Sequence, residues 1–252
     1  MNTLLPSKHT MEVVRRSDMP IAPITFQAQH RSIQISIPQT SPSLYEQVYS
    51  SILEAICGGI LRPGDRLNQD ELAARLNVSR QPVTQALTVL RSQDFVQDSG
   101  RRGLLVAPIR RAFFESLYEL RESLDPMAAK LAARHSDKLS RERVDALMER
   151  GHAALRDGRI AELTSADMSF HIWIYESAGN PLLLETLRLY WNHLRRAMVT
   201  VLEPSTVRDR VWDEHARILD AVLSGDQQEA ERLSLLHIQQ AAQRVVGNLP
   251  ST

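Results

Sequence analysis

The chain has 252 residues, of which 43% are hydrophobic and 24% charged, a composition typical of a folded protein with one or two domains rather than of a disordered chain. Thirty lysines and arginines balance thirty acidic residues, which excludes a uniformly basic nucleic-acid wrapper but not a local basic face. A single cysteine excludes a disulfide framework and a cysteine-rich zinc module, and no apolar run is long enough to span a bilayer, so we expect a cytoplasmic protein without a secretory leader.

Residues 1–42 differ from the rest of the chain. Five prolines interrupt them, no amphipathic segment is sustained, and their net charge is +2. We therefore expect a flexible N-terminal arm. The alternative is an extra short strand or helix that docks on the body through Ile33, Ile35 and Ile37, whose alternation suits an edge strand.

Residues 43–110 are predicted to form three helices followed by a β-hairpin. The expected elements are helices over 44–58, 69–76 and 79–93 and strands over 95–97 and 104–106. Asn68 is a suitable cap for the second helix, with Glu71 three residues later as in a capping box, and Ser79 is a suitable cap for the third.

The third helix has an apolar face and a polar face. Its apolar stripe consists of Val83, Ala86, Leu87 and Leu90. Its other faces carry side chains suited to base edges and phosphates: Arg80, Gln81, Thr84, Gln85 and Thr88. Arg101 and Arg102 at the hairpin tip add positive charge that can reach the DNA backbone or minor groove. A solvated face on a structural helix is the alternative, but the whole pattern predicts a DNA-binding helix-turn-helix.

Residues 44–106 resemble the winged helix-turn-helix of GntR-family transcriptional regulators. The matching stretches are 59–67 (GILRPGDRL), 71–73 (ELA), 78–80 (VSR), 82–83 (PV), 86–87 (AL) and 102–103 (RG). The resemblance implies operator contacts by the start of the recognition helix and by the wing. These residues are Ser79, Arg80, Gln81, Thr84, Arg101 and Arg102. The family usually has Arg-Glu where this chain has Thr84-Gln85, so an arginine that often contacts DNA is missing.

Residues 111–252 are predicted to be entirely helical, which makes the protein mainly α. The expected helices lie near 111–135, 140–157, 160–178, 181–203, 206–224 and 226–247. Their short connections predict an antiparallel bundle of six to seven helices. This region has a net charge of −3.

Four side chains of this region suggest a metal site. Asp167 and His171 stand four residues apart on one expected helix and therefore project to the same side. His215 and His237 lie on the last two expected helices. A carboxylate and three imidazoles projecting into one bundle suit a divalent transition metal with open coordination positions. Taken singly, each histidine is more often a surface or hydrogen-bonded core residue.

Residues 111–247 resemble the FCD effector domain of the FadR-type branch of GntR regulators. The matching stretches are 117–121 (LYELR), Asp167 with Phe170-His171, 179–181 (GNP), Glu214-His215 with Ile218, and His237. The resemblance implies that Asp167, His171, His215 and His237 hold a metal ion, and that the ion helps to hold a small carboxylate-bearing effector. Zn²⁺ is the first expectation, with Ni²⁺ or Mn²⁺ as alternatives.

Arg121 is a candidate for binding an effector carboxylate, because a guanidinium presents a planar fork of donors. The alternative is an ion pair with Glu122, Asp125 or a neighbouring helix. His193 falls outside the metal pattern, and we interpret it as pocket wall or as structural.

Three functions compete at this stage. The favoured one is a metabolite-responsive regulator, without enzymatic activity, that binds a palindromic operator as a homodimer, its DNA affinity modulated by an organic acid or sugar acid. The second is a metal-dependent, hydrolase-like enzyme that uses the aspartate and three histidines. The third is a protein whose metal serves stability alone.

Overall fold

A computed structural model describes residues 24–28, 31–35, 42–100, 103–201 and 205–249. It divides into the units 1–43 and 44–252. In the first unit, strand β1 (Ile24–Ala28) pairs antiparallel with β2 (Arg31–Ile35), and Ile33 and Ile35 stand opposite Phe26 and Ile24. Strand β2 thus contains two of the three alternating isoleucines, and Ile37 and most of the expected arm lie outside the described residues.

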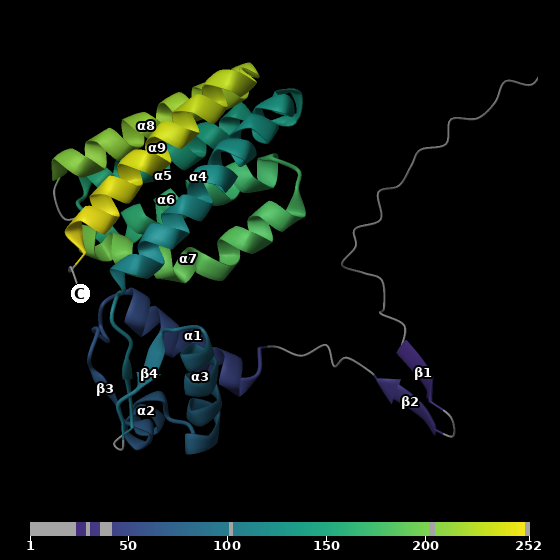
Figure 1. Cartoon of the computed structure of the whole chain (residues 1–252), viewed down its shortest axis with the longest axis vertical. Helices are drawn as coiled ribbons and strands as arrows, with labels where there is room; N and C mark the ends of the chain where they lie inside the picture. Colours follow the sequence, from purple (N-terminus) through teal and green to yellow (C-terminus); the bar gives the residue numbers. More distant parts are fainter. Residues whose placement is uncertain (1–23, 29–30, 36–41, 101–102, 202–204, 250–252) are drawn as a thin grey trace, which may run out of the picture. The chain divides into compact units, whose positions relative to one another are not determined.

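The second unit begins with three helices and a small sheet (Figure 1). The elements are α1 (Leu44–Cys57), β3 (Arg66–Leu67), α2 (Gln69–Leu76), α3 (Arg80–Ser92), β4 (Val96–Asp98) and β5 (Leu104–Val106). The sheet order is β3-β5-β4, with both pairings antiparallel. The hairpin was predicted from the sequence, whereas β3 was not, because two residues are too few to show alternation.

The apolar stripe of α3 is fully buried, as its spacing predicts. Val83, Ala86, Leu87 and Leu90 each have 0% exposure, and they pack with Ile52 and Ile56 of α1. This burial leaves the polar face of α3 directed away from the core.

The ends of α2 and α3 differ in how they are capped. The Asn68 side chain accepts hydrogen bonds from the backbone N–H groups of Asp70 and Glu71, which confirms the cap expected for α2. Asn77 adopts a left-handed φ of 53°, which allows the chain to turn sharply between the helices. Ser79 occupies the N-cap position of α3, but its side chain makes no capping hydrogen bond in the structure, so this part of the expectation is wrong.

Six α-helices follow in the described part of the chain, which confirms the mainly helical fold. They are α4 (Arg111–Arg134), α5 (Arg141–Arg156), α6 (Ile160–Ser177), α7 (Pro181–Val201), α8 (Ser205–Ser224) and α9 (Gln227–Asn248). Figure 1 shows α8 and α9 running side by side, and α4 also packs along α9. Helix α4 also packs against α6 and α8, so α4, α6, α8 and α9 border one interior. None of the helices in the described ranges has the length and apolar character needed to cross a membrane.

Helix α7 contacts the helix-turn-helix region at several points. Both Nη atoms of Arg195 donate to the Glu54 carboxylate on α1. The imidazole of His193 stacks on Phe95 with a centroid distance of 4.1 Å, and its Nε2 lies 3.0 Å from the Gln93 carbonyl oxygen. His193 therefore has a structural role at this contact, where it also lines a small surface pocket with Phe113 and Arg196.

Candidate functional site

The start of α3 presents exposed polar side chains around a fixed arginine. Arg80 Nε donates to Gln69 Oε1 at 3.1 Å, and Arg80 Nη1 lies 3.5 Å from Asp70 Oδ1. Thr84 Oγ1 donates to the same Gln69 oxygen at 3.0 Å. Gln69, at the first position of α2, thus orients two of the expected DNA-contacting side chains. This contact was not predictable from the sequence, because it joins two different helices.

The remaining expected DNA contacts fall into two groups. Ser79 and Gln81 are exposed beside Arg80 and Thr84. Arg101 and Arg102 lie outside the described residues.

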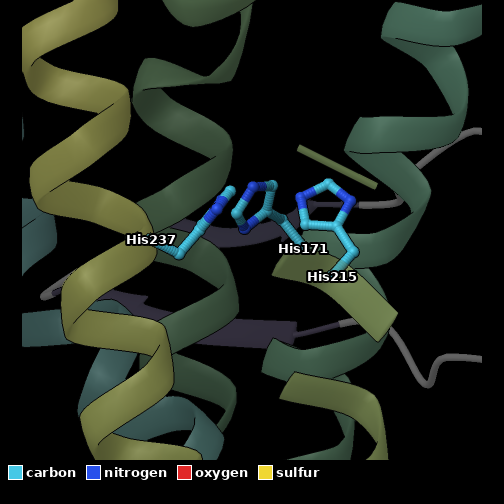
Figure 2. Close-up of side chains that lie close together, drawn as sticks. All are labelled: His171, His215 and His237. Carbon is cyan, nitrogen blue, oxygen red and sulfur yellow. The ribbon is translucent and has the colours of Figure 1, made fainter. Parts of the chain in front are cut away.

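Three buried histidines meet in the interior of the bundle. Figure 2 shows the imidazoles of His171, His215 and His237 next to one another, each from a different helix: α6, α8 and α9. One nitrogen from each ring lies within 4.8 Å of the others. Asp167 adjoins them, with Oδ1 3.5 Å from His215 Nε2 and Oδ2 3.9 Å from His171 Nε2. The structure brings together all four side chains that we expected to share a site.

Burial determines the charge of these groups. Desolvation lowers the pKa of His171 and His215 well below the ordinary value and also lowers that of His237, so the three imidazoles are neutral at neutral pH. Desolvation raises the pKa of Asp167 to about 7. Neutral imidazole is the form that ligates a metal, and a bound cation favours the ionised carboxylate.

His215 is the member of the cluster whose surroundings best suit a cation. Its exposure is 0%, and neither ring nitrogen has a hydrogen-bond partner among the described residues. Phe170 stacks on one face of the ring with a centroid distance of 3.8 Å, and the Trp212 ring lies edge-on at 5.0 Å. A buried imidazole without a partner is costly, and a metal bound at a ring nitrogen removes that cost. Three nitrogens and one carboxylate fit Zn²⁺ and similar divalent ions.

Arg121 is held by a buried ion pair. Its Nη2 donates to Asp125 Oδ2 at 2.8 Å, and the Tyr175 hydroxyl donates to Asp125 Oδ1 at 2.6 Å. Arg121 Nη2 also lies 3.4 Å from His171 Nε2. The alternative interpretation, an ion pair with Asp125, is therefore what the structure contains, although the guanidinium remains beside the histidines.

A small cavity adjoins the histidines. Its volume is about 40 Å³, and its polar lining consists of Tyr118, Arg121, Asp167, His171, His237 and Arg244. A cavity of roughly 10–15 Å³ holds one water, so this cavity has room for an ion with a few waters. A larger ligand requires the surrounding side chains to move.

Glu214 and Arg244 are parts of the site that the sequence did not reveal. Glu214 Oε2 lies 2.7 Å from His237 Nδ1, and both Nη atoms of Arg244 donate to the Glu214 carboxylate. Burial opposes ionisation of Glu214, but the hydrogen bonds from His237 and Arg244 outweigh it and lower the pKa to about 2. The available signal was the spacing of His237 and Arg244, which stand two helical turns apart on one face of α9.

Comparison with known proteins gives two family matches within the chain. Residues 44–106 match the family described as "Bacterial regulatory proteins, gntR family", and residues 116–240 match the FCD domain. The Nta operon transcriptional regulator of Aminobacter aminovorans is 30% identical over 181 residues, which cover 71% of this chain and 83% of the relative. The transcriptional regulator LutR of Bacillus subtilis is 29% identical over 205 residues, which cover 73% of this chain and 92% of LutR.

Two solved structures share the fold. A GntR transcriptional regulator from Rhodococcus sp. RHA1 superimposes with a TM-score of 0.72 at 21% identity, covering 82% of this chain and 99% of the other. E. coli McbR/YncC gives a TM-score of 0.67 at 22% identity, covering 79% of this chain and 95% of the other.

The fold and these matches define a transcriptional regulator with a DNA-binding helix-turn-helix, and not the hydrolase-like enzyme that was the alternative. The chain belongs to the GntR family of bacterial regulatory proteins and carries an FCD domain.

Proposed function

We propose that this protein is a cytoplasmic regulator that binds a palindromic operator as a homodimer and responds to a small carboxylate-bearing metabolite with the help of a bound divalent metal. In this proposal residues 43–110 bind DNA, and residues 111–252 bind the effector and form the dimer. Residues 1–42 are a separate N-terminal segment.

The exposed start of α3 supports the assignment of the DNA contacts. Because the apolar stripe of α3 is fully buried, its opposite face is free to enter a major groove. Arg80 is oriented by Gln69 and suits a guanine edge, whereas Gln81 suits adenine. Ser79 and Thr84 supply hydroxyls beside them, and Arg101 and Arg102 are assigned to the wing contact.

Exposed apolar side chains on two helices support association with a second copy. On α4 these are Leu120 and Met127, which are 37% and 39% exposed, and on α7 they are Leu182 and Leu189, which are 73% and 72% exposed. Members of each pair stand seven residues apart and so lie on one helix face. A two-fold dimer presents two recognition helices to the two halves of a palindrome.

The metal assignment rests on Asp167, His171, His215 and His237, with Zn²⁺ as the expected ion and Ni²⁺ or Mn²⁺ as alternatives. A cation bound there supplies positive charge that attracts the carboxylate of an organic acid or sugar acid. Arg121 is the protein group that we assign to the effector carboxylate. To bind it, the guanidinium must either donate to both carboxylates at once or give up its hydrogen bond to Asp125.

Helix α7 connects the ligand pocket with the DNA-binding region. Its Trp191 ring lies 6.1 Å from the His171 ring, and its Arg195 pairs with Glu54 of α1. A ligand that moves α7 therefore changes the placement of the DNA-binding region, which is how we expect the effector to alter DNA affinity.

The observation that carries the metal proposal is the fully buried His215, whose ring nitrogens have no hydrogen-bond partner in the described residues. Metal analysis of purified protein is expected to give about one ion per chain, and His215→Ala is expected to lose most of it. His152→Ala is the control, because His152 lies on α5 beside Trp212 and outside the cluster. Equal metal content in wild type and His215→Ala would contradict the ligand set.

A metal that serves stability alone is the remaining alternative. Small organic acids and sugar acids added to the metal-loaded protein distinguish the two cases, because a bound effector raises the melting temperature. If no organic acid or sugar acid changes the melting temperature, the result favours a metal that serves stability alone.

A further inference from the structure

The side chain of Glu214 lies between a candidate metal ligand and an arginine of the cavity. Its Oε2 atom is 2.7 Å from His237 Nδ1 and 2.9 Å from Arg244 Nη2, and its Oε1 atom is 3.0 Å from Arg244 Nη1. The side chains of Glu214 and Arg244 are only 13% and 18% exposed. Both oxygens of the carboxylate thus have fixed partners in a partly desolvated setting.

This arrangement determines which nitrogen of His237 carries a proton. A carboxylate paired with a guanidinium is an acceptor only, so His237 Nδ1 must be the donor. The neutral ring then has its lone pair on Nε2, which is the atom left to ligate a metal. An imidazole whose other nitrogen donates to a carboxylate is also a more basic ligand.

Arg244 keeps Glu214 in place and also faces the cavity. It is seven residues after His237 on α9, so the two side chains leave the same face of the helix. Its bidentate contact restricts the rotation of the carboxylate. Because Arg244 also lines the cavity, the contact joins the cavity wall to the histidine cluster.

We propose that Glu214 is a positioning residue that fixes His237 with Nε2 directed to the metal, and that Arg244 holds Glu214 in that position. The inference rests on the metal site proposed above. It adds two residues that touch no metal themselves and act on metal affinity through His237.

The test measures Zn²⁺ affinity by competition with a chromophoric chelator. Glu214→Gln is expected to weaken Zn²⁺ binding about 10- to 100-fold, as loss of an outer carboxylate partner typically does. Arg244→Gln is expected to weaken Zn²⁺ binding less than Glu214→Gln does. The double variant is expected to bind Zn²⁺ as tightly as Glu214→Gln, because both residues act through one histidine. Thermal melts check folding, and the double variant removes both charges if a single variant does not fold.

Helix α9 offers a matched control pair. Arg232 Nε and Nη2 donate to the Glu229 carboxylate, but the two side chains are 60% and 40% exposed on the outside of the helix. Glu229→Gln and Arg232→Gln are expected to leave Zn²⁺ affinity unchanged.

A spectroscopic readout separates positioning from general destabilisation. The ¹⁵N shifts of His237 are expected to report an Nδ1–H ring in wild type and a mixture of tautomers in Glu214→Gln. Unchanged Zn²⁺ affinity and an unchanged tautomer in Glu214→Gln, in a protein whose wild type binds Zn²⁺ and whose His215→Ala variant does not, would overturn this inference alone. Absence of Zn²⁺ binding in the wild type would instead overturn the metal site and, with it, this inference.

Discussion

Two groups of side chains beside the histidine cluster are each held together by a carboxylate. Asp125 joins Arg121 to Tyr175, and Glu214 joins Arg244 to His237. The first group is almost inaccessible, with Arg121 and Asp125 at 5% and 2% exposure, whereas Glu214 and Arg244 are partly exposed. Both arginines that line the cavity are therefore already paired with a carboxylate of the protein.

Asp125 is predicted to be essential for stability. Asp125→Ala leaves the buried Arg121 guanidinium without its counter-charge, which costs about 3–5 kcal/mol in the free energy of unfolding. Chemical denaturation measures this loss. Glu115→Ala is the matched control, because Glu115 pairs with Arg111 at the same spacing on the same helix but is 49% exposed, so a loss of only about 0–1 kcal/mol is expected. Equal losses of unfolding free energy in both variants would show that burial does not determine how much an ion pair contributes to stability.

The sequence predicted which histidines lie together better than it predicted the residues that contact them. Asp167 and His171 are four residues apart, and helix periodicity alone puts them on one side. The contacts of Glu214 with His237 and of Gln69 with Arg80 join residues of different helices, and no periodicity within one helix reveals them. Ser79 shows the opposite failure, because its residue type suits a cap that its side chain does not form.

At the level of elements, the helices follow their apolar spacing and their breaks. The observed ends of α4 to α9 all lie within two residues of the expected positions, which most often followed from a glycine or proline at the break. Pro126 lies inside α4, and the helix continues through it from Arg111 to Arg134. The contact of α7 with the helix-turn-helix region was not predictable, because His193 and Arg195 carry no local signal for a distant partner.

His193 at this contact is predicted to make folding sensitive to acid. Burial is the main cause that lowers its pKa from 6.5 to about 4, and nearby Arg196 and Arg110 also lower it, whereas the Gln93 carbonyl and Asp94 raise it. As the pH falls from about 6.5 to about 4, the unfolded chain takes up this proton before the folded chain does. The free energy of unfolding therefore decreases over that window.

Comparison with His193→Phe isolates this contribution. Phenylalanine keeps an aromatic ring beside Phe95 but has no titrating group. Between pH 6.5 and 4 the wild type is expected to lose stability relative to His193→Phe by on the order of 1–3 kcal/mol, measured by urea denaturation at each pH. Parallel pH profiles for the two proteins would show that His193 is not the responsible group.

At the scale of the whole molecule, the zero net charge is an average over unequal regions. Residues 1–42 carry +2, residues 43–110 carry +1 and residues 111–252 carry −3. The attraction to DNA is therefore assigned to a few arginines on one region, while the acidic helical region is repelled by the phosphates. The family matches cover both regions and so define the class of protein, but neither match names an effector.

The most direct test of the account is the DNA affinity of Arg80→Ala. Wild-type protein first selects a duplex from a random pool, and binding to that duplex is then measured at fixed salt. Arg80→Ala is expected to lose about 1–3 kcal/mol, or roughly 5- to 150-fold in Kd. Arg91→Ala is the control, because Arg91 pairs with Asp98 at the other end of α3 and is expected to bind nearly as wild type does. Enrichment of no palindromic sequence, or equal affinity of Arg80→Ala and wild type, would contradict the account.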